Sequence, residues 1–283
     1  MSTIPTSVTE NQYEDYIRPH LRVAQRGDVY KIALYKVFNY ILYRLHTGCQ
    51  WEQLPVKREA ESQAVEISWQ GVYYHFRKWS ADGSLEKVWQ TSIQINHEHL
   101  DLTHINLDGS HALAKKGGEA VAYQGWKRGK TSNFLSLTAA HGYIIATTGI
   151  VAGNHHDAFA LKSHLQEAFK FLKRQGLNLA GTYFNADSAF DTREARKVCF
   201  NYELIPNIAE NKRHRKTTKR GRKRLFNVEI YQCRFTAERT FAWIDKFRAL
   251  LVRYDFNATP FLGAHYLAFV MINFHHLFAK PKA

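Results

Sequence analysis

The sequence predicts an α/β protein in which a mixed sheet flanked by helices follows a small all-α, helix-turn-helix-like domain. Apolar residues at three-to-four spacing dominate the first 100 residues, whereas short β-branched runs alternate with helical patterns after residue 103. The chain has 283 residues, of which 45% are hydrophobic, and this composition excludes disorder over the whole chain. We expect a helical domain over residues 1–100 and an α/β domain over residues 101–283.

Three helices are expected in the first domain. Apolar stripes predict them over residues 32–45, 69–79 and 85–93. Gly48 is placed to end the first helix, and Ser84 follows an Asp-Gly turn as the expected N-cap of the third. Short helices joined by tight turns are compatible with a helix-turn-helix whose last helix enters a DNA major groove. A plain helical bundle is the alternative, because the region carries 11 Lys+Arg and 11 Asp+Glu and is therefore neutral.

The second domain alternates strands and helices. Strands are expected over residues 104–108, 133–138, 143–151, 179–187 and 203–208, and helices over 158–172, 192–199 and 229–251. This alternation indicates a mixed sheet covered by helices. The apolar stripe over residues 266–277 is expected to form a core or partner-facing helix.

The net positive charge of the chain comes entirely from the second domain, because the first domain is neutral. The net charge is +14, and nine basic residues without an intervening acid form an insertion at about 211–226: Lys212, Arg213, Arg215, Lys216, Lys219, Arg220, Arg222, Lys223 and Arg224. A phosphate backbone would neutralise such a run with release of counterions, so we expect double-stranded DNA as a partner. A solubilising loop or a localisation signal is the alternative.

A second candidate DNA contact is the segment over residues 123–130, which mixes glycine, aromatic and basic residues. Its candidate contacts are Trp126, Lys127, Arg128 and Lys130. It is predicted to be either a loop along DNA, with Trp126 stacking on a base, or a solvated hairpin.

Three carboxylates are candidates for chemistry. Asp108 and Asp187 are each expected to end a strand, and Glu238 lies on the late helix with Arg234 one turn before it. If the two strands are neighbours, both aspartates lie at one end of the sheet. Three carboxylates without thiolate or paired imidazole ligands describe a site for Mg²⁺ or Mn²⁺, and two such ions promote phosphoryl displacement. Turn aspartates and a surface Arg–Glu pair are the alternative.

The histidines near these carboxylates are expected to be structural. His111 is predicted to be a turn residue bonded to backbone. The adjacent His155 and His156 would point to opposite faces of a strand, which disfavours zinc, and Asp157 is placed to cap the following helix.

Several motifs together resemble those of DDE insertion-sequence transposases. The segment from Tyr231 to Glu238 resembles the signature in which tyrosine, arginine and glutamate are separated by two and three residues. Asp108 in LDGS and Asp187 in NADSAFD resemble the first and second aspartates of that family. Residues 151–157 (VAGNHHD) are similar to its Gly-Asn-x-x-Asp segment, and residues 47–55 (TGCQWEQLP) to its N-terminal domain. The resemblance covers roughly residues 30 to 278.

The resemblance implies a ribonuclease-H-like catalytic domain in which Asp108, Asp187 and Glu238 hold two Mg²⁺ ions, with Mn²⁺ as a substitute. Such an enzyme cuts transposon ends and joins their 3′-hydroxyls to target DNA, and it acts as a homodimer in the DNA complex. Tyr231 and Arg234 would orient Glu238 or contact a flanking phosphate. The alternatives are an inactive or domesticated DNA-binding descendant, and a metal-dependent nuclease without strand transfer.

The chain departs from this family at one signature position. The residue seven positions after the glutamate, a lysine in the family, is Asp245, and Lys246 follows it. One residue on a helix is a rotation of about 100°, so Lys246 does not simply replace the lysine. Its phosphate contact would pass to Arg239, Arg248 or Arg253, or be weakened; Arg239 and Lys246 are kept as candidate DNA contacts.

No export or membrane segment is expected. Residues 1–11 lack the basic and apolar regions of a signal peptide, and polar residues interrupt the longest apolar stretch, 261–278. The three cysteines are far apart and odd in number, which excludes a disulfide scaffold. We therefore expect a soluble protein of a reducing compartment without a membrane partner, and the resemblance implies a nucleoid-associated protein of the bacterial cytoplasm.

Overall fold

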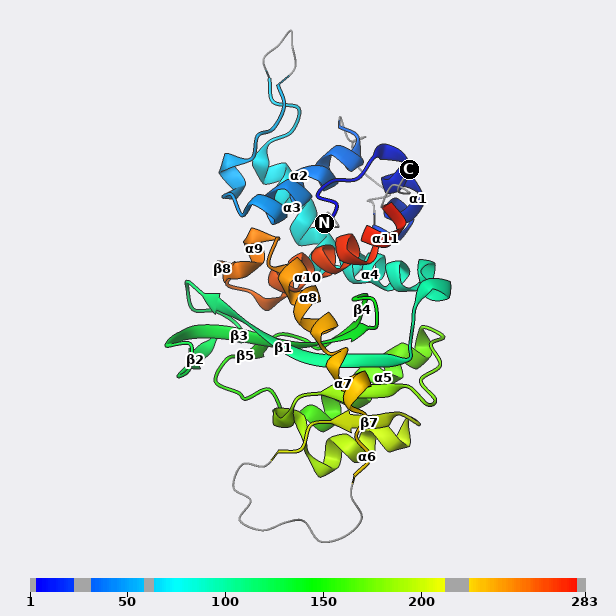
Figure 1. Cartoon of the computed structure of the whole chain (residues 1–283). Coiled ribbons are helices and arrows are strands. Elements are labelled where there is room, and N and C mark those ends of the chain that lie inside the picture. Colours follow the sequence, from blue (N-terminus) through cyan, green and yellow to red (C-terminus); the bar gives the residue numbers. More distant parts are fainter. Residues whose placement is uncertain (1–3, 23–31, 59–63, 212–223, 279–283) are drawn as a thin grey trace.

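The computed structural model of the protein describes residues 4–22, 32–58, 64–211 and 224–278. A twisted sheet crosses the middle of the molecule (Figure 1). The N-terminal helices and the long C-terminal helix α10 (Ala258–Asn273) lie on one side of it, and α5 (Leu161–Arg174) and α6 (Arg193–Asn201) lie on the other. Within the described ranges, no helix is long and apolar enough to cross a membrane.

The N-terminal part is helical, as predicted. Its α-helices are α1 (Glu10–Tyr16), α2 (Leu34–Thr47), α3 (Trp69–Ala81) and α4 (Ser84–Ile95), with short 3₁₀ turns at Arg18–His20, Trp51–Gln53 and His97–His99. Helix α1 was not predicted, although Thr9 and Gln12 form the capping box that starts it. Gly48 ends α2 in the left-handed conformation (φ 71°), as predicted.

The start of α4 differs from the prediction. Its N-cap is Gly83, which has a φ of 78°, and Ser84 is the first helical residue. The Ser84 hydroxyl accepts the backbone N–H of Arg22 at 3.0 Å instead of capping its own helix.

Helix α4 is a core helix. Trp89 at its centre is 2% exposed and stacks on Phe171 and Tyr266, with ring centroids 5.3 and 5.2 Å apart. Its indole N–H donates to the Ile144 carbonyl of the sheet at 3.0 Å. Of the residues of α4 only Lys87 and Gln94 are exposed, so this helix has few side chains that could reach DNA bases.

The sheet has the topology of a ribonuclease-H-like fold, which confirms the predicted fold class. In the described chain, β1 is central, β3 pairs with it antiparallel, and β6 and β7 follow on its other side in parallel, in the order β2-β3-β1-β6-β7. Helix α5 precedes β6, and α6 connects β6 to β7. Strands β4 and β5 pair with β3, and β8 with β1. The strands are β1 (His104–Ala114), β2 (Ala122–Gln124), β3 (Gly129–Ala139), β4 (Ile144–Thr147), β5 (Val151–Ala152), β6 (Tyr183–Ala186), β7 (Ile205–Ile208) and β8 (Val252–Arg253).

Strand β1 is longer than predicted. It pairs with β6 only as far as Asn106 and then continues beside β3 to Leu113. Asp108 therefore lies within a strand and not at its end, because β1 keeps an antiparallel partner after it leaves β6. Asp187 follows the last residue of β6 directly, as predicted.

Other boundaries also differ from the predictions: β6 begins at Tyr183, four residues later than expected, and β7 begins at Ile205, two residues later. The strand expected over residues 143–151 is divided into β4 and β5, and α5 begins at Leu161, three residues later than predicted. The helix expected over 229–251 is divided into α7 (Val228–Gln232), α8 (Phe235–Ile244) and α9 (Arg248–Leu251). The chain bends after α8 where Phe247, 1% exposed, turns into the core. The apolar C-terminal stripe forms α10 and α11 (His275–Phe278), and α10 is a core helix as predicted.

Candidate active site

Asp108 is more enclosed than Glu238. Its side chain is 23% exposed. One carboxylate oxygen accepts the N–H of Gly109 at 2.9 Å, and the other lies 3.4 Å from Nη1 of Arg234. Burial raises the pKa of Asp108; the Gly109 N–H and Arg234 oppose this shift, while the negative charges of Asp187 and Asp157 add to it. A carboxylate in this position gains most from a neighbouring cation.

Glu238 contacts the same guanidinium as Asp108, that of Arg234. It lies in the first turn of α8, and its Oε1 accepts Nη2 of Arg234 at 2.9 Å. Arg234 lies between α7 and α8, where the backbone turns through bonds of the i to i−3 type, such as Arg234 N–H to the Tyr231 carbonyl at 3.0 Å. The predicted Arg–Glu pair is therefore formed although the helix is not continuous, and its guanidinium also reaches Asp108.

Asp187 lies directly after β6, the strand that pairs with β1. Its Oδ1 accepts the N–H of Ala189 at 2.7 Å and so begins the 3₁₀ turn Ser188–Phe190. Its charge acts on Asp108, but its carboxylate shares neither the Arg234 contact nor a hydrogen bond with the other two. Among the described residues, no group of three or more His, Cys, Asp or Glu side chains is arranged to hold a metal ion. The structure thus brings Asp108 and Glu238 together and places Asp187 beside them.

The donor set nevertheless suits a hard divalent cation. All three groups are carboxylates, which are the ligands of Mg²⁺ and Mn²⁺, and two of them already face one positive charge. The Glu238 side chain is 63% exposed, so it can turn toward the aspartates without disturbing the core.

A fourth carboxylate, Asp157, lies behind Asp108 and was not predicted to belong to the site. Its Oδ1 accepts Nδ2 of Asn133 at 2.8 Å and lies 3.2 Å from Nε2 of His111. The bond to His111, followed by that to Asn133, holds the pKa of Asp157 below its ordinary value. A Cβ on Gly109 would come within 3.3 Å of the Asp157 carboxylate, so glycine gives it room.

These contacts correct two predictions about the neighbouring motif. His111 lies in β1 and bonds side chains, not backbone, because β1 continues past Asp108. Asp157 does not cap α5, whose N-cap is Ala160. His155 stacks on Phe159 with ring centroids 3.7 Å apart, and the His156 ring accepts the N–H of Ala158.

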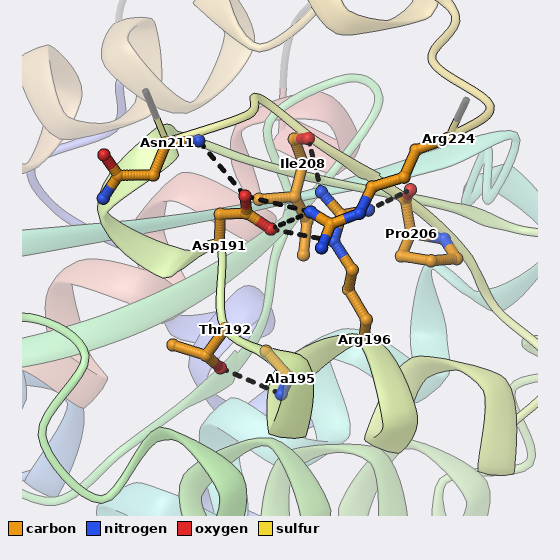
Figure 2. Close-up of polar contacts among 8 residues, drawn as sticks. All are labelled: Asp191, Thr192, Ala195, Arg196, Pro206, Ile208, Asn211 and Arg224. Atoms are coloured by element: carbon orange, nitrogen blue, oxygen red, sulfur yellow. Dashed lines mark hydrogen bonds and ion pairs between the residues drawn. The ribbon is translucent and has the colours of Figure 1, made fainter. Parts of the chain in front are cut away.

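Asp191 connects the second aspartate segment to the basic insertion (Figure 2). It accepts Nε of Arg196 at 2.8 Å, the N–H of Asn211 at 3.1 Å and Nη1 of Arg224 at 2.7 Å. Burial alone would raise the pKa of Asp191, but these bonds and the two guanidinium charges bring it below its ordinary value. The two ends of the insertion are therefore fixed four residues after Asp187.

The predicted DNA contacts of the insertion mostly lie outside the described residues. These are Lys212, Arg213, Arg215, Lys216, Lys219, Arg220, Arg222 and Lys223. Arg224 is described, and its guanidinium is paired with Asp191. Its charge is therefore already compensated within the protein.

The remaining predicted DNA contacts lie in two places. Trp126, 96% exposed, lies with exposed Lys127 and Arg128 at the tip of the hairpin between β2 and β3, and Lys130 follows in β3. Arg239 and Lys246 are exposed on and after α8, and the Arg239 guanidinium lies 5.0 Å from the Trp243 ring centroid.

Two other residues of the signature region are placed by packing. Arg253 is 1% exposed and donates to Ser132 and to the carbonyls of Asp255 and Phe256, so it cannot take over the missing lysine's phosphate contact. Tyr231 packs on Phe226 with ring centroids 4.9 Å apart.

Comparison with known families covers both parts of the chain. Residues 100–272 match the family described as "DDE superfamily endonuclease". The chain belongs to this family. Residues 8–89 of this DDE superfamily member match a second family, described as "Putative transposase of IS4/5 family". No curated protein matches the chain.

Solved structures similar to this DDE superfamily member include several of Mos1 transposase. The Mos1 transposase paired-end complex with left transposon end is 12% identical over 89% of this chain and 80% of that chain, with a TM-score of 0.29. A pre-cleavage Mos1 transpososome is 13% identical over 93% and 83%, with a TM-score of 0.29. The catalytic domain of Mos1 mariner transposase is 12% identical over 65% and 88%, also with a TM-score of 0.29.

Proposed function

We propose that the protein is a DNA transposase that cleaves the ends of its element and transfers the 3′-hydroxyl strand to target DNA by metal-dependent phosphoryl transfer. One observation supports this most: Arg234 joins Asp108 and Glu238 at the point where Asp187 ends the neighbouring parallel strand. In this proposal the carboxylates of three separate elements of the sheet serve one metal site.

Each residue has a distinct role in this proposal. Asp108, Asp187 and Glu238 would hold two Mg²⁺ ions, with Mn²⁺ as a substitute. When bound, these ions activate water or a 3′-hydroxyl for attack and stabilise charge on the reacting phosphate. Arg234 orients Glu238 and supplies a positive charge for a flanking phosphate, while Tyr231 supports the turn that carries it. The chain contributes position and electrostatics, and no residue forms a covalent intermediate.

The DNA-facing surface is proposed to include α3 and not α4. Helix α3 exposes Gln70, Tyr74 and Arg77 at helical spacing, and these residues line a groove with Lys78 and Asn257 from which acidic residues are absent. A stripe of basic and polar groups without acids favours a phosphate backbone. Together with the hairpin tip at Trp126, this surface would hold one DNA end per protomer of a homodimer acting on the bacterial nucleoid.

Cleavage and joining of labelled element ends, with Mg²⁺ or with EDTA, tests the proposal. The wild type should cut and join only with Mg²⁺. Asp187→Asn should abolish both steps and keep DNA affinity within about threefold, because carboxylate ligands serve the chemistry and not DNA binding. Glu167→Gln, a change of the same kind on the exposed face of α5, is the control and should leave both steps unchanged.

Each of the other outcomes identifies an alternative. Binding without cutting in Mg²⁺ would indicate an inactive descendant. Cutting without joined product would indicate a nuclease. Cleavage retained by Asp187→Asn would contradict the assignment of this aspartate.

The basic insertion makes a separate prediction about DNA affinity. Replacing the eight basic residues between Lys212 and Lys223, both included, by glutamine should flatten the salt dependence of DNA binding. The slope should fall by about 0.9 for each phosphate contact that is lost. Arg224 is left unchanged because it pairs with Asp191. Fluorescence anisotropy between low and high salt measures the slope, and an unchanged slope would show that the insertion does not contact DNA.

A further inference from the structure

A row of buried asparagines crosses the three parallel strands of the sheet. Asn106 of β1, Asn185 of β6 and Asn207 of β7 are neighbours in register, and none is more than 1% exposed. Nδ2 of Asn207 donates to Oδ1 of Asn185 at 2.8 Å, and Nδ2 of Asn185 donates to Oδ1 of Asn106 at 2.9 Å. We call these three residues the asparagine ladder.

The ladder also holds the segment that leads to Glu238. The second N–H of the Asn185 amide donates to the Ile230 carbonyl at 2.9 Å, and that of Asn207 donates to the Asn227 carbonyl at 2.9 Å. The Asn207 Oδ1 accepts the Asn227 N–H at 2.9 Å. Asn227 is itself the N-cap of α7, since its Oδ1 accepts the Ile230 N–H at 3.0 Å.

These bonds use the hydrogen-bonding capacity of the amides at their centre almost completely. Asn185 and Asn207 each donate both amide hydrogens and accept one bond. An amide buried to this degree is costly unless its bonds are made, so the network tolerates one arrangement and disfavours others. At the far end, Nδ2 of Asn106 has no partner among the described residues.

Two asparagines of the ladder each lie two residues before one of the two aspartates. Asn106 precedes Asp108 by two residues and Asn185 precedes Asp187 by two, so each pair points to the same face of the sheet. The start of α7 lies on that face. Its N-cap, Asn227, is seven residues before Arg234. One set of bonds therefore connects the backbone elements of all three carboxylates.

We propose that Asn185 and Asn207 are positioning residues of the active centre: they fix α7, and through it Arg234 and Glu238, at a set distance from Asp108 and Asp187. A substitution of Asn185 or Asn207 would keep all three carboxylate side chains, but their relative positions would be less well fixed. This inference rests on the proposed metal-dependent function, and it assigns to the ladder the geometry on which that function depends.

Asn207→Asp tests the inference, since it keeps the shape and the acceptor but replaces the two donors. The matched control is Asn273→Asp in α10: Asn273 is also buried, and its amide likewise donates to two groups, Ser92 and the Ile144 carbonyl, and accepts the Ile144 N–H. Both variants are measured as the full chain without DNA, by amide hydrogen exchange, Mn²⁺ binding in electron paramagnetic resonance, and thermal unfolding.

Asn207→Asp should speed exchange of the amides over residues 228–238 about tenfold or more and weaken Mn²⁺ binding about tenfold. Asn273→Asp should lower the unfolding temperature comparably but change neither quantity. Asn207→Ser, a milder change, should show the same two effects to a smaller extent and serves if Asn207→Asp does not fold.

Two results would overturn the inference: exchange over 228–238 like that of the wild type, or faster exchange with unchanged Mn²⁺ affinity. Failure of the proposed function has a different signature, namely Mn²⁺ binding by the wild type that Asp187→Asn and Glu238→Gln leave unaltered. In that case the positioning of a metal site is refuted as well, while the exchange data still decide whether the ladder fixes α7.

Discussion

At the scale of single residues, the candidate site is organised by charge compensation. Arg234 forms ion pairs with two carboxylates, Asp108 and Glu238, and Asp191 forms ion pairs with two guanidiniums, of Arg196 and Arg224. The Asp191 side chain is 4% exposed, and a carboxylate so buried requires such partners. Arg196 in turn bonds the Ile208 carbonyl at the end of β7, so the charge cluster joins the insertion to the sheet (Figure 2).

Asp191→Asn should lower the free energy of unfolding by roughly 2 to 3 kcal/mol at pH 7, because a buried charge-assisted network is lost. The pKa of Asp191 is lowered in the folded state, so its stabilising effect is complete above its ordinary value of 3.8 and is lost as pH falls through the lower folded value. Urea unfolding of both proteins between pH 7 and pH 3 measures this.

The difference between wild type and Asp191→Asn should therefore shrink below about pH 4. Glu167→Gln, at an exposed position, serves as the control. Its free energy of unfolding should equal that of the wild type at every pH. A pH-independent difference for Asp191→Asn would show that packing, and not charge, makes the contribution.

At the scale of elements, the close approach of two backbone segments explains why the Gly-Asn-x-x-Asp segment begins with glycine. Gly153 follows β5, and a Cβ there would lie 1.8 Å from the Thr131 hydroxyl and 2.6 Å from its carbonyl oxygen in β3. Its N–H donates to the same carbonyl at 3.0 Å. The glycine thus lets the chain lie against β3, and Asp157 four residues later reaches both β1 and β3 through His111 and Asn133.

Gly153→Ala should destabilise the protein by about 1 to 3 kcal/mol, because the backbone of β3 cannot give way like a side chain. Gly149→Ala, in the loop before β5, has nothing within 4 Å of the added carbon and should be neutral or slightly stabilising. Thermal unfolding of the two variants compares them. Equal stability of the two would contradict the close approach of β5 to β3.

At the scale of the whole molecule, the helical and sheet parts share one core. Helix α10, from the C-terminal end of the chain, packs on both α3 and α4 and on the sheet. Trp89 connects them, because its ring stacks on Phe171 of α5 and Tyr266 of α10 while its N–H bonds β4. A displacement of the N-terminal helices therefore also disturbs the layer that supports the active centre.

Trp89→Ala should cost about 3 to 5 kcal/mol of stability, as for a buried aromatic side chain replaced by alanine. Trp126→Ala is the matched control: this tryptophan is 96% exposed, so its loss should leave stability unchanged and weaken DNA binding instead. Calorimetry and fluorescence anisotropy measure the two effects. A stability loss of equal size in both variants would refute the buried connection through Trp89.

The sequence by itself determined the order of the elements and the residue types of the site. Apolar periodicity located most of the helices, β-branched runs located most of the strands, and Asp108, Asp187, Arg234 and Glu238 were identified from local patterns and family resemblance. A local signal also settled the cap at Gly48, because it depends on bonds within one turn.

Only the tertiary structure decided how these residues meet. The position of Asp108 within β1 depends on β3, the sharing of Arg234 depends on a contact across 126 positions, and the burial of α4 depends on α5 and α10. The asparagine ladder was visible only as an asparagine two residues before each aspartate. The physical reason is that a hydrogen bond between strands, or the burial of a helix face, is fixed by register and packing between distant segments, and no local pattern encodes it.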